Sequence, residues 1–138
     1  MPALLALSIR QPWAWAIIHA GKDLENRKTL FSHRGLTLIH ASAGMTFDEY
    51  DDAGHFMNEI GVLDVPPLTS LERGGIIGAV EIVDSVKESD SPWWMGPRAL
   101  VLRNPRPIPF IPCRGTVAPL FWTPTPSVLA EATAALRA

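Results

Sequence analysis

Residues 4–27 read LLALSIRQPWAWAIIHAGKDLENR and contain the signals that decide the fold. The apolar run at 4–9 predicts a short buried strand. Residues 11–20 predict a helix with Pro12 in its first turn, where a missing N–H costs nothing. One apolar face of this helix combines residues three and four apart, namely Trp13, Ala16, Ile17 and Ala20. Gly21 is typical of a helix C-terminus, so a strand and a helix open the domain.

The charged residues after Gly21 form the most informative local pattern. Lys22, Asp23, Glu25 and Arg27 place four ionisable groups of mixed sign within six residues. Two cations flanking a carboxylate suit an anionic, hydrogen-bonding ligand such as a nucleotide. The alternative is a solvated turn with a surface salt bridge, which would contribute little to stability. On a flat strand Lys22 would point away from the other two, but a left-handed Gly21 would let Lys22 reach the same cleft.

The rest of the chain predicts a mixed α+β domain. A Thr46–Glu49 capping box predicts a helix ending near residue 60, and Gly78 suggests a bulge or a close backbone approach within a long strand. Further strands are predicted at 34–41, 75–86, 98–103 and 108–111, and a last helix at about 126–137. Five or six strands with two to three helices and no regular β-α alternation favour a small β-barrel with peripheral helices. We expect one domain over 1–138.

Composition excludes several classes of protein. With 47% hydrophobic and 19% charged residues, the chain is typical of soluble globular proteins. Its single cysteine, Cys113, excludes an internal disulfide framework, and its four histidines show no metal-ligand spacing, so we expect neither a metal nor a cofactor. We expect a cytoplasmic location without membrane insertion. No stretch is apolar enough to span a bilayer, and no basic residue precedes the N-terminal apolar run.

The net charge of −2 conceals an uneven distribution. Residues 1–34 contain five Lys or Arg and two acids, whereas residues 35–72 contain seven acids and no Lys or Arg. Residues 73–138 contain seven Lys or Arg and five acids. Local sign determines where a polyanion can dock, so the total charge leaves a nucleic-acid partner open.

Several motifs, in this order, resemble those of the ASCH family. They are residues 7–14 (LSIRQPWA), the K-x-x-E-x-R pattern of residues 22–27, His33-Arg34-Gly35 before a strand ending at Ala41, and residues 74–81 (GGIIGAVE). The likeness spans residues 4–103, although the family usually has glycine where this chain has Ala20. It implies a PUA-like β-barrel and an association with RNA or other nucleic acids.

The resemblance and the basic N-terminal quarter together predict a cationic cleft around Lys22, Glu25 and Arg27. Its expected partner is RNA, another single-stranded nucleic acid or a nucleotide, and the oligomeric state is left open. Trp94 is a stacking candidate, because adjacent tryptophans in a polar loop rarely both bury. His40 is either a site residue or a hydrogen-bonded, half-buried histidine. The expected binding set is Ser8, Arg10, Gln11, Lys22, Glu25, Arg27, His40, Ser42 and Trp94.

An enzymatic alternative also follows from the resemblance. Some small ASCH proteins remove an acyl group from a modified cytidine with a lysine, a threonine and a glutamate. Lys22 and Glu81 would match the lysine and the glutamate, but Glu25 stands in place of the threonine nucleophile. A ribonuclease with Glu25 as general base is a further possibility, so enzyme activity is undecided. A protein-interaction domain would instead predict an exposed apolar patch and no basic cleft.

Overall fold

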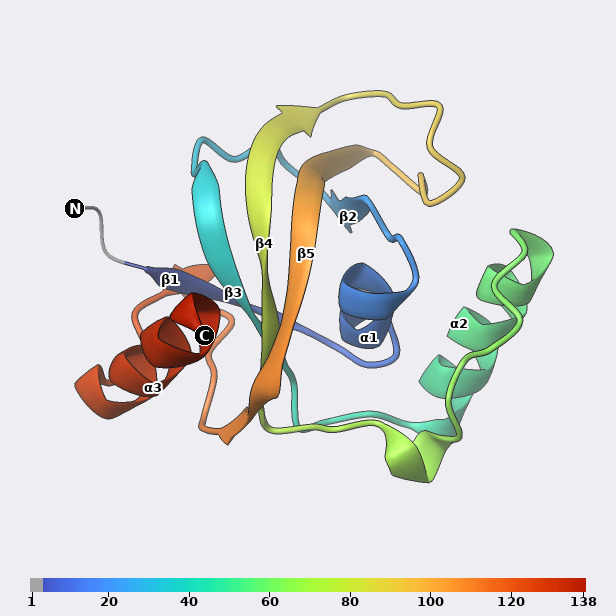
Figure 1. Cartoon of the computed structure of the whole chain (residues 1–138). Coiled ribbons are helices and arrows are strands. Elements are labelled where there is room, and N and C mark those ends of the chain that lie inside the picture. The colour runs from blue at the N-terminus through green and yellow to red at the C-terminus, as the bar shows by residue number, and fades with distance from the viewer. Residues whose placement is uncertain (1–3) are drawn as a thin grey trace.

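The computed structural model describes residues 4–138. Within this range six strands form one curled sheet, and three α-helices lie around it (Figure 1). The elements are β1 (Leu5–Ile9), α1 (Trp13–His19), β2 (Leu24–Arg27), β3 (Gly35–Ala41), α2 (Phe47–Glu59), the 3-10 turn η1 (Leu68–Ser70), β4 (Gly75–Val86), β5 (Arg98–Pro112), β6 (Phe121–Trp122) and α3 (Pro126–Arg137). The sheet forms a half-barrel, which confirms the predicted small α+β barrel.

The strand order is β2-β5-β4-β3-β1-β6, and β1 and β3 run parallel to each other. The other neighbouring strands are antiparallel. Parallel pairing brings the carboxyl ends of β1 and β3 to the same edge of the sheet. There the N–H of Ser42 donates to the carbonyl of Ile9 at 3.0 Å, so the residues after both strands lie side by side.

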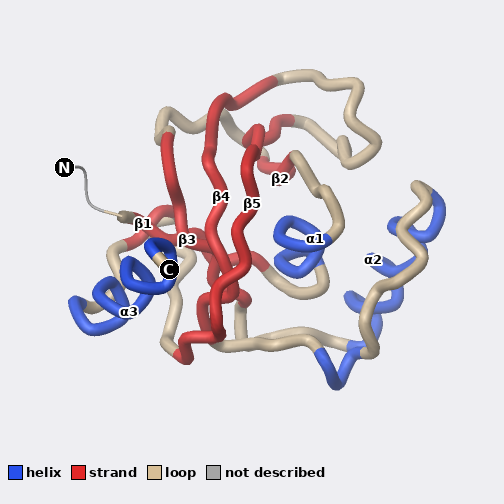
Figure 2. Tube along the Cα trace, viewed as in Figure 1, coloured by secondary structure: helices blue, strands red, loops and turns tan. Residues whose placement is uncertain are grey.

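The two faces of the sheet carry different cores. Helix α1 packs on one face and α3 on the other (Figure 2). Successive strand residues point to opposite faces, so Leu7 and Ile39 face α1, whereas Ala6 and Leu38 face α3. The α3 stripe of Leu129, Ala132 and Leu136 belongs to the second core. This alternation also decides to which face each polar strand residue belongs.

Several predicted boundaries differ from those observed. Helix α1 starts at Trp13 and not at Gln11, because Pro12 is the N-cap residue. The side-chain oxygen of Gln11 accepts a hydrogen bond from the N–H of Trp15 at 2.9 Å. Gly21 has φ +74°, as predicted, and the capping box of Thr46 and Glu49 is present.

The two strands predicted at 98–103 and 108–111 form one strand, β5. Strand β2 pairs only with residues 98–101, so residues 103–112 form a free edge within the described part of the sheet. Prolines are tolerated on edges and at bulges, and register shifts against β4 occur in this region. The prolines therefore did not end the strand. The short strands β2 and β6 were not predicted as sheet members.

Gly78 lies where β4 closely approaches both β5 and α1. A Cβ atom there would lie 2.5 Å from the carbonyl oxygen of Arg106 and 2.7 Å from Cδ1 of Ile18. We expect Gly78→Ala to lower the free energy of unfolding by about 1–3 kcal/mol, because backbone and core must both shift. Urea unfolding followed by tryptophan fluorescence would measure this.

Gly54→Ala is the matched control. Gly54 lies within α2, and a Cβ atom there meets nothing within 4 Å. Alanine should stabilise this helix by up to about 1 kcal/mol. Equal stability changes at the two positions would contradict the close approach at Gly78.

Candidate nucleic-acid interface

Lys22, Glu25 and Arg27, hereafter the Lys22 cluster, meet around one carboxylate. The Nζ of Lys22 donates to Oε1 of Glu25 at 3.1 Å and to the carbonyl of Leu24. Nη2 of Arg27 donates to Oε2 of Glu25 at 3.0 Å. The positive φ of Gly21 ends α1 and turns the chain, so the expectation that Lys22 joins the same cluster is confirmed.

Burial distinguishes the Lys22 cluster from a solvated turn. The Lys22 side chain is 3% exposed and that of Glu25 13%. The ammonium group lies 5.6 Å from the centre of the Trp13 ring, and this ring packs edge-on against Phe56 of α2. A desolvated cation over an indole face is held more strongly than an exposed one. The surface salt bridge considered as an alternative is therefore excluded for Lys22.

The residues between the motif positions hold the loop 89–97 against the cluster. The side chain of Asn26 accepts from the N–H groups of Met95 (2.9 Å) and Gly96 (3.2 Å) and donates to the carbonyl of Trp93 (3.0 Å). The hydroxyl of Ser91 donates to Asp23 at 2.6 Å. The roles of Asp23 and Asn26 were not predicted from the sequence. The polar residues Asp23 and Asn26 within the motif were the available signal.

Two adjoining hollows result, and both are open to solvent. The tryptophan cleft, about 200 Å³ in volume, is lined by Trp13, Lys22, Glu25, Asn26 and Met95. The arginine hollow, about 580 Å³ in volume, is lined by Asn26, Arg27, Lys28, Thr29, Phe31, Gly96, Pro97, Val117 and Leu120. Asn26 borders both, so the two hollows adjoin each other.

Trp94 does not line either hollow. Trp93 is buried at 4% exposure, and Trp94 is half-buried with its ring beside Gly96. Met95 instead reaches the tryptophan cleft. The prediction that the two tryptophans would not both be buried holds, because Trp94 is only half-buried. The residue of this loop that lines the tryptophan cleft is Met95 and not Trp94.

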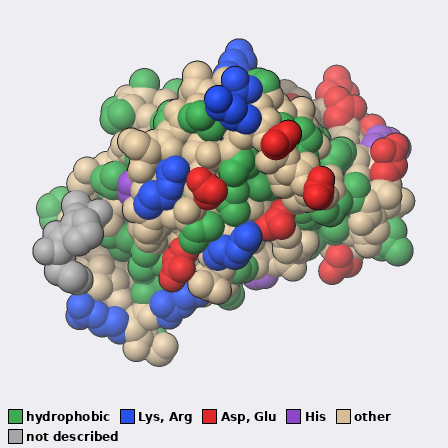
Figure 3. Space-filling model, turned by 90° about the horizontal axis from the view of Figure 1, so that it is seen from above, with side chains coloured by type: hydrophobic (Ala, Val, Ile, Leu, Met, Phe, Trp, Pro, Cys, Tyr) green, Lys and Arg blue, Asp and Glu red, His purple; other side chains and the backbone are tan. Residues whose placement is uncertain are grey.

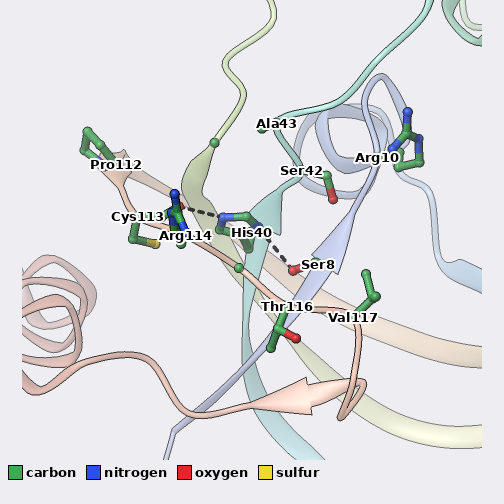
Figure 4. A pocket seen from close by; sticks show the side chains of 12 residues that line it. Ser8, Arg10, His40, Ser42, Ala43, Pro112, Cys113, Arg114, Thr116 and Val117 are labelled. Atoms are coloured by element: carbon green, nitrogen blue, oxygen red, sulfur yellow. Dashed lines mark hydrogen bonds between the residues drawn. The ribbon is translucent and has the colours of Figure 1, made fainter.

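Four other predicted residues, Ser8, Arg10, His40 and Ser42, lie elsewhere. They line a depression of about 920 Å³ at the carboxyl ends of β1 and β3, hereafter the serine–histidine depression (Figure 4). Its floor is the pair Ser8 and His40, whose Oγ and Nδ1 atoms are 3.2 Å apart. Ser8 alternates with Leu7 and Ile9, which face α1, so it points to the other face of the sheet. The predicted single cleft is thus divided into two places.

Arg10 and Gln11 are already engaged within the protein. Arg10 makes a two-bonded ion pair with Glu49, with distances of 2.5 and 2.6 Å. This pairing lowers the pKa of Glu49 from 4.5 to about 2 and raises the pKa of Arg10. Gln11 is buried, and its amide donates to the carbonyl of Glu72 at 2.8 Å. Gln11 therefore positions α1, and it lines neither the tryptophan cleft nor the arginine hollow.

Glu81 does not join Lys22. It lies exposed on β4 beside Leu36 and Arg103, which are exposed as well, and its carboxylate accepts from Asn104 at 3.1 Å. Its neighbours Val80 and Ile82 face α1, so Glu81 points to the opposite face from Lys22. The lysine–glutamate pairing implied by the amidohydrolase resemblance is absent here. Among residues 4–138, no three His, Cys, Asp or Glu side chains form a group that could hold a metal ion.

Comparison with protein-family models matches residues 7–99 to the ASCH domain, well over half of the chain. The chain belongs to the ASCH domain family. No curated protein matches it significantly. The matched ASCH region contains the Lys22 cluster as well as Ser8 and His40, whereas the segment 112–117 that completes the serine–histidine depression lies beyond it. Among the described residues, no helix of this ASCH protein has the length and apolar character needed to cross a membrane.

Removing the shared carboxylate tests the Lys22 cluster. Glu25→Gln keeps the side-chain shape but leaves a buried ammonium without its anion. We expect the free energy of unfolding to fall by about 1–3 kcal/mol. The double variant Lys22→Met, Glu25→Gln should recover part of this loss in the same urea titration. If the double variant is as unstable as the sum of the single variants, the two residues are not coupled.

His40 should make stability depend on pH. Burial lowers its pKa from the ordinary 6.5, and its bond to Cys113 opposes this only partly. The neutral form therefore contributes stability that is complete above pH 6.5 and lost as pH falls through the lowered pKa. His40→Gln should reduce the change in urea midpoint between about pH 5 and pH 7.5.

Part of this pH dependence should survive in His40→Gln. The pKa of His33 is also lowered, by burial and by the charge of Arg34. His19→Gln, on the exposed surface of α1, is the matched control and should keep the wild-type profile. An unchanged profile in His40→Gln would contradict a buried, neutral His40.

Proposed function

We propose that this ASCH domain binds single-stranded RNA, with one unpaired base in the tryptophan cleft and neighbouring phosphates in the arginine hollow. The observation that carries the proposal is the convergence of two motif cations on one carboxylate at an open, aromatic-walled cleft. Single-stranded RNA is commonly recognised by splayed-out bases that stack on aromatic rings and bond through their edges.

The cleft offers both donors and acceptors to a base edge. An ammonium group has three N–H donors, and Lys22 uses two of them for Leu24 and Glu25, which leaves one for a ligand. A carboxylate has about four acceptor sites, and the two cations occupy two of those on Glu25. The remaining sites can accept from a base amine. Cations and carboxylate together therefore suit a polar ring with mixed hydrogen-bonding groups.

The walls of the cleft suit a flat ring. Trp13 contributes an indole and Met95, which is 51% exposed, a thioether side chain. Stacking of a base on an aromatic side chain contributes about 1–3 kcal/mol. The volume of about 200 Å³ is smaller than that of pockets for drug-sized ligands, which begin near 300 Å³. One base fits this scale better than a whole nucleotide, so the phosphates would lie outside the cleft.

The adjoining arginine hollow supplies positive charge for these phosphates. Arg27 is 25% exposed, and Lys28 is exposed beside it. Arg27 also lies directly opposite Arg98 in the β2–β5 ladder, which places both side chains on one face. In Figure 3, Asp and Glu side chains lie at the α2 end of the face and also among the Lys and Arg side chains over the rest of it. The positive charge that favours a polyanion at β2 is therefore local and comes from Arg27, Lys28 and Arg98.

A hydrolase function has less support from the geometry. Glu81 lies on the opposite face of the sheet from Lys22. Both oxygens of Glu25 already accept hydrogen bonds from Lys22 and Arg27, so the structure engages this carboxylate in holding the two cations. Binding is therefore the function we propose.

Fluorescence anisotropy with a labelled single-stranded RNA tests the proposal. Arg27→Gln should weaken binding about tenfold at roughly 100 mM salt. It should also reduce the slope of log affinity against log salt by about 0.7, the value for one phosphate contact on a single strand. Arg27→Lys should restore the slope but only part of the affinity, because a lysine lacks the planar fork.

The charge-matched control is Arg103→Gln on the opposite face of β5. Its affinity should equal that of the wild type, and a thermal melt of each variant shows that it is folded. Equal loss in Arg27→Gln and Arg103→Gln would indicate non-specific charge attraction. Tighter binding to single-stranded DNA of the same sequence would assign the site to DNA instead.

A further inference from the structure

In the floor of the serine–histidine depression, the donor and the acceptor of each hydrogen bond can be assigned. Nε2 of His40 donates to the carbonyl of Cys113 at 2.9 Å, which leaves Nδ1 as the acceptor in the neutral ring. The hydroxyl of Ser8 then donates to Nδ1, while its oxygen accepts from Nε1 of Trp122 at 3.1 Å. Each of these groups is satisfied inside the protein. Ser8 and His40 therefore support the depression from within the protein and do not themselves bind the ligand.

Ser8 and His40 fix the loop that follows β5. A Cβ atom on Gly115 would lie 2.5 Å from the His40 ring and 2.6 Å from Oγ of Ser8, so only glycine allows this approach. The bond from His40 to the carbonyl of Cys113 holds the other side of the same loop. In Figure 4, Arg114 and Thr116 border the depression from this loop, and Ser42 and Arg10 border it from the ends of β3 and β1. Contacts with His40 and Ser8 therefore position this loop.

The charged side chains around the depression are positive, and they differ in whether a carboxylate neutralises them. Arg10 is neutralised by Glu49, whereas the guanidinium of Arg114 has no hydrogen bond or ion pair among residues 4–138. Arg73 lies at the rim, where it donates to the carbonyl of Ala43 at 2.8 Å. No carboxylate lines the depression within the described residues. The hydroxyl of Thr116 donates to the carbonyl of Ala118 at 3.1 Å, so an anion placed there would meet the free guanidinium of Arg114 and the hydroxyl of Ser42.

The depression adjoins the proposed RNA site. Val117 lines both the serine–histidine depression and the arginine hollow, and Asn26 links the arginine hollow to the tryptophan cleft. Its volume of about 920 Å³ exceeds what one phosphate needs, so the anion is expected to be part of a longer molecule. Guanidinium and hydroxyl groups together are typical ligands of phosphate.

We infer that the serine–histidine depression is a second subsite, which binds a phosphate group through Arg114 and Ser42. The assignment of this phosphate to an RNA strand rests on the proposed function. In that arrangement the strand runs from the tryptophan cleft past Arg27 and Val117 to Arg114. Ser8 and His40 are positioning residues, because they hold the loop and bear no free group.

RNA length separates the two subsites. Arg114→Gln should weaken an RNA of about twelve nucleotides by roughly fivefold to tenfold and lower its salt slope by about 0.7. It should leave the affinity for an RNA of about three nucleotides unchanged, because so short a strand occupies only the tryptophan cleft and the arginine hollow. Gly115→Ala, which keeps the charge but displaces the loop, should reproduce the loss for the long RNA. Arg137→Gln at the end of α3 is the charge-matched control and should bind both RNAs normally.

Titration with inorganic phosphate, followed by NMR, distinguishes the possible failures. The amides of Ser42 and Thr116 should shift in the wild type and not in Arg114→Gln. If the long RNA depends on Arg27 but not on Arg114, the second subsite is overturned and the proposed function stands. If no RNA binds but phosphate shifts these amides in an Arg114-dependent way, the phosphate subsite stands and the RNA function is overturned. Absence of both signals overturns both.

Discussion

The parallel pairing of β1 with β3 is the constraint on which both candidate sites depend. Two parallel neighbours cannot be joined by a tight turn, so the chain must cross from the end of β1 back to the start of β3. The crossing segment contains α1, the turn at Gly21 and β2, and it places α1 inside the curl of the sheet. The Lys22 cluster lies on this crossing, and the serine–histidine depression lies where the two parallel strands end. One topological requirement thus creates both places.

Sequence patterns were sufficient wherever the cause of the structure is local. The left-handed Gly21, the Thr46 capping box and the helix Pro126–Arg137 were predictable because each depends on neighbouring residues. Strands β2 and β6 were missed. Segments of four and two residues are too short to show a periodicity, and their pairing depends on distant partners.

The same distinction between local and distant contacts applies to the candidate site. The spacing of Lys22, Glu25 and Arg27 identified one cluster, but the role of Asn26 requires a loop seventy residues away. Strand alternation, applied to Ser8 and Glu81, would have placed both on the face opposite Lys22.

Pairing decides the surface charge of this protein more than composition does. Glu25 and Glu49 each bind arginine or lysine side chains, which reduces the net positive charge that these cations present to a ligand. Glu49 also caps α2, so its carboxylate serves a helix end and a cation together. Lys28 and Arg114 have no carboxylate partner among the described residues, so their full charge is available to an anion. A count of charges over the whole chain would not identify them.

The free half of β5 has a further consequence for how the protein behaves at high concentration. Residues 103–112 have no strand beside them within the described sheet, and a bare edge of this length normally offers a row of N–H donors to any passing chain. Prolines at 105, 107 and 109 remove three of these donors at alternate positions. A second molecule can therefore not extend the sheet by regular hydrogen bonding along this side. The same prolines that obscured the strand in the sequence protect the barrel from edge-to-edge aggregation.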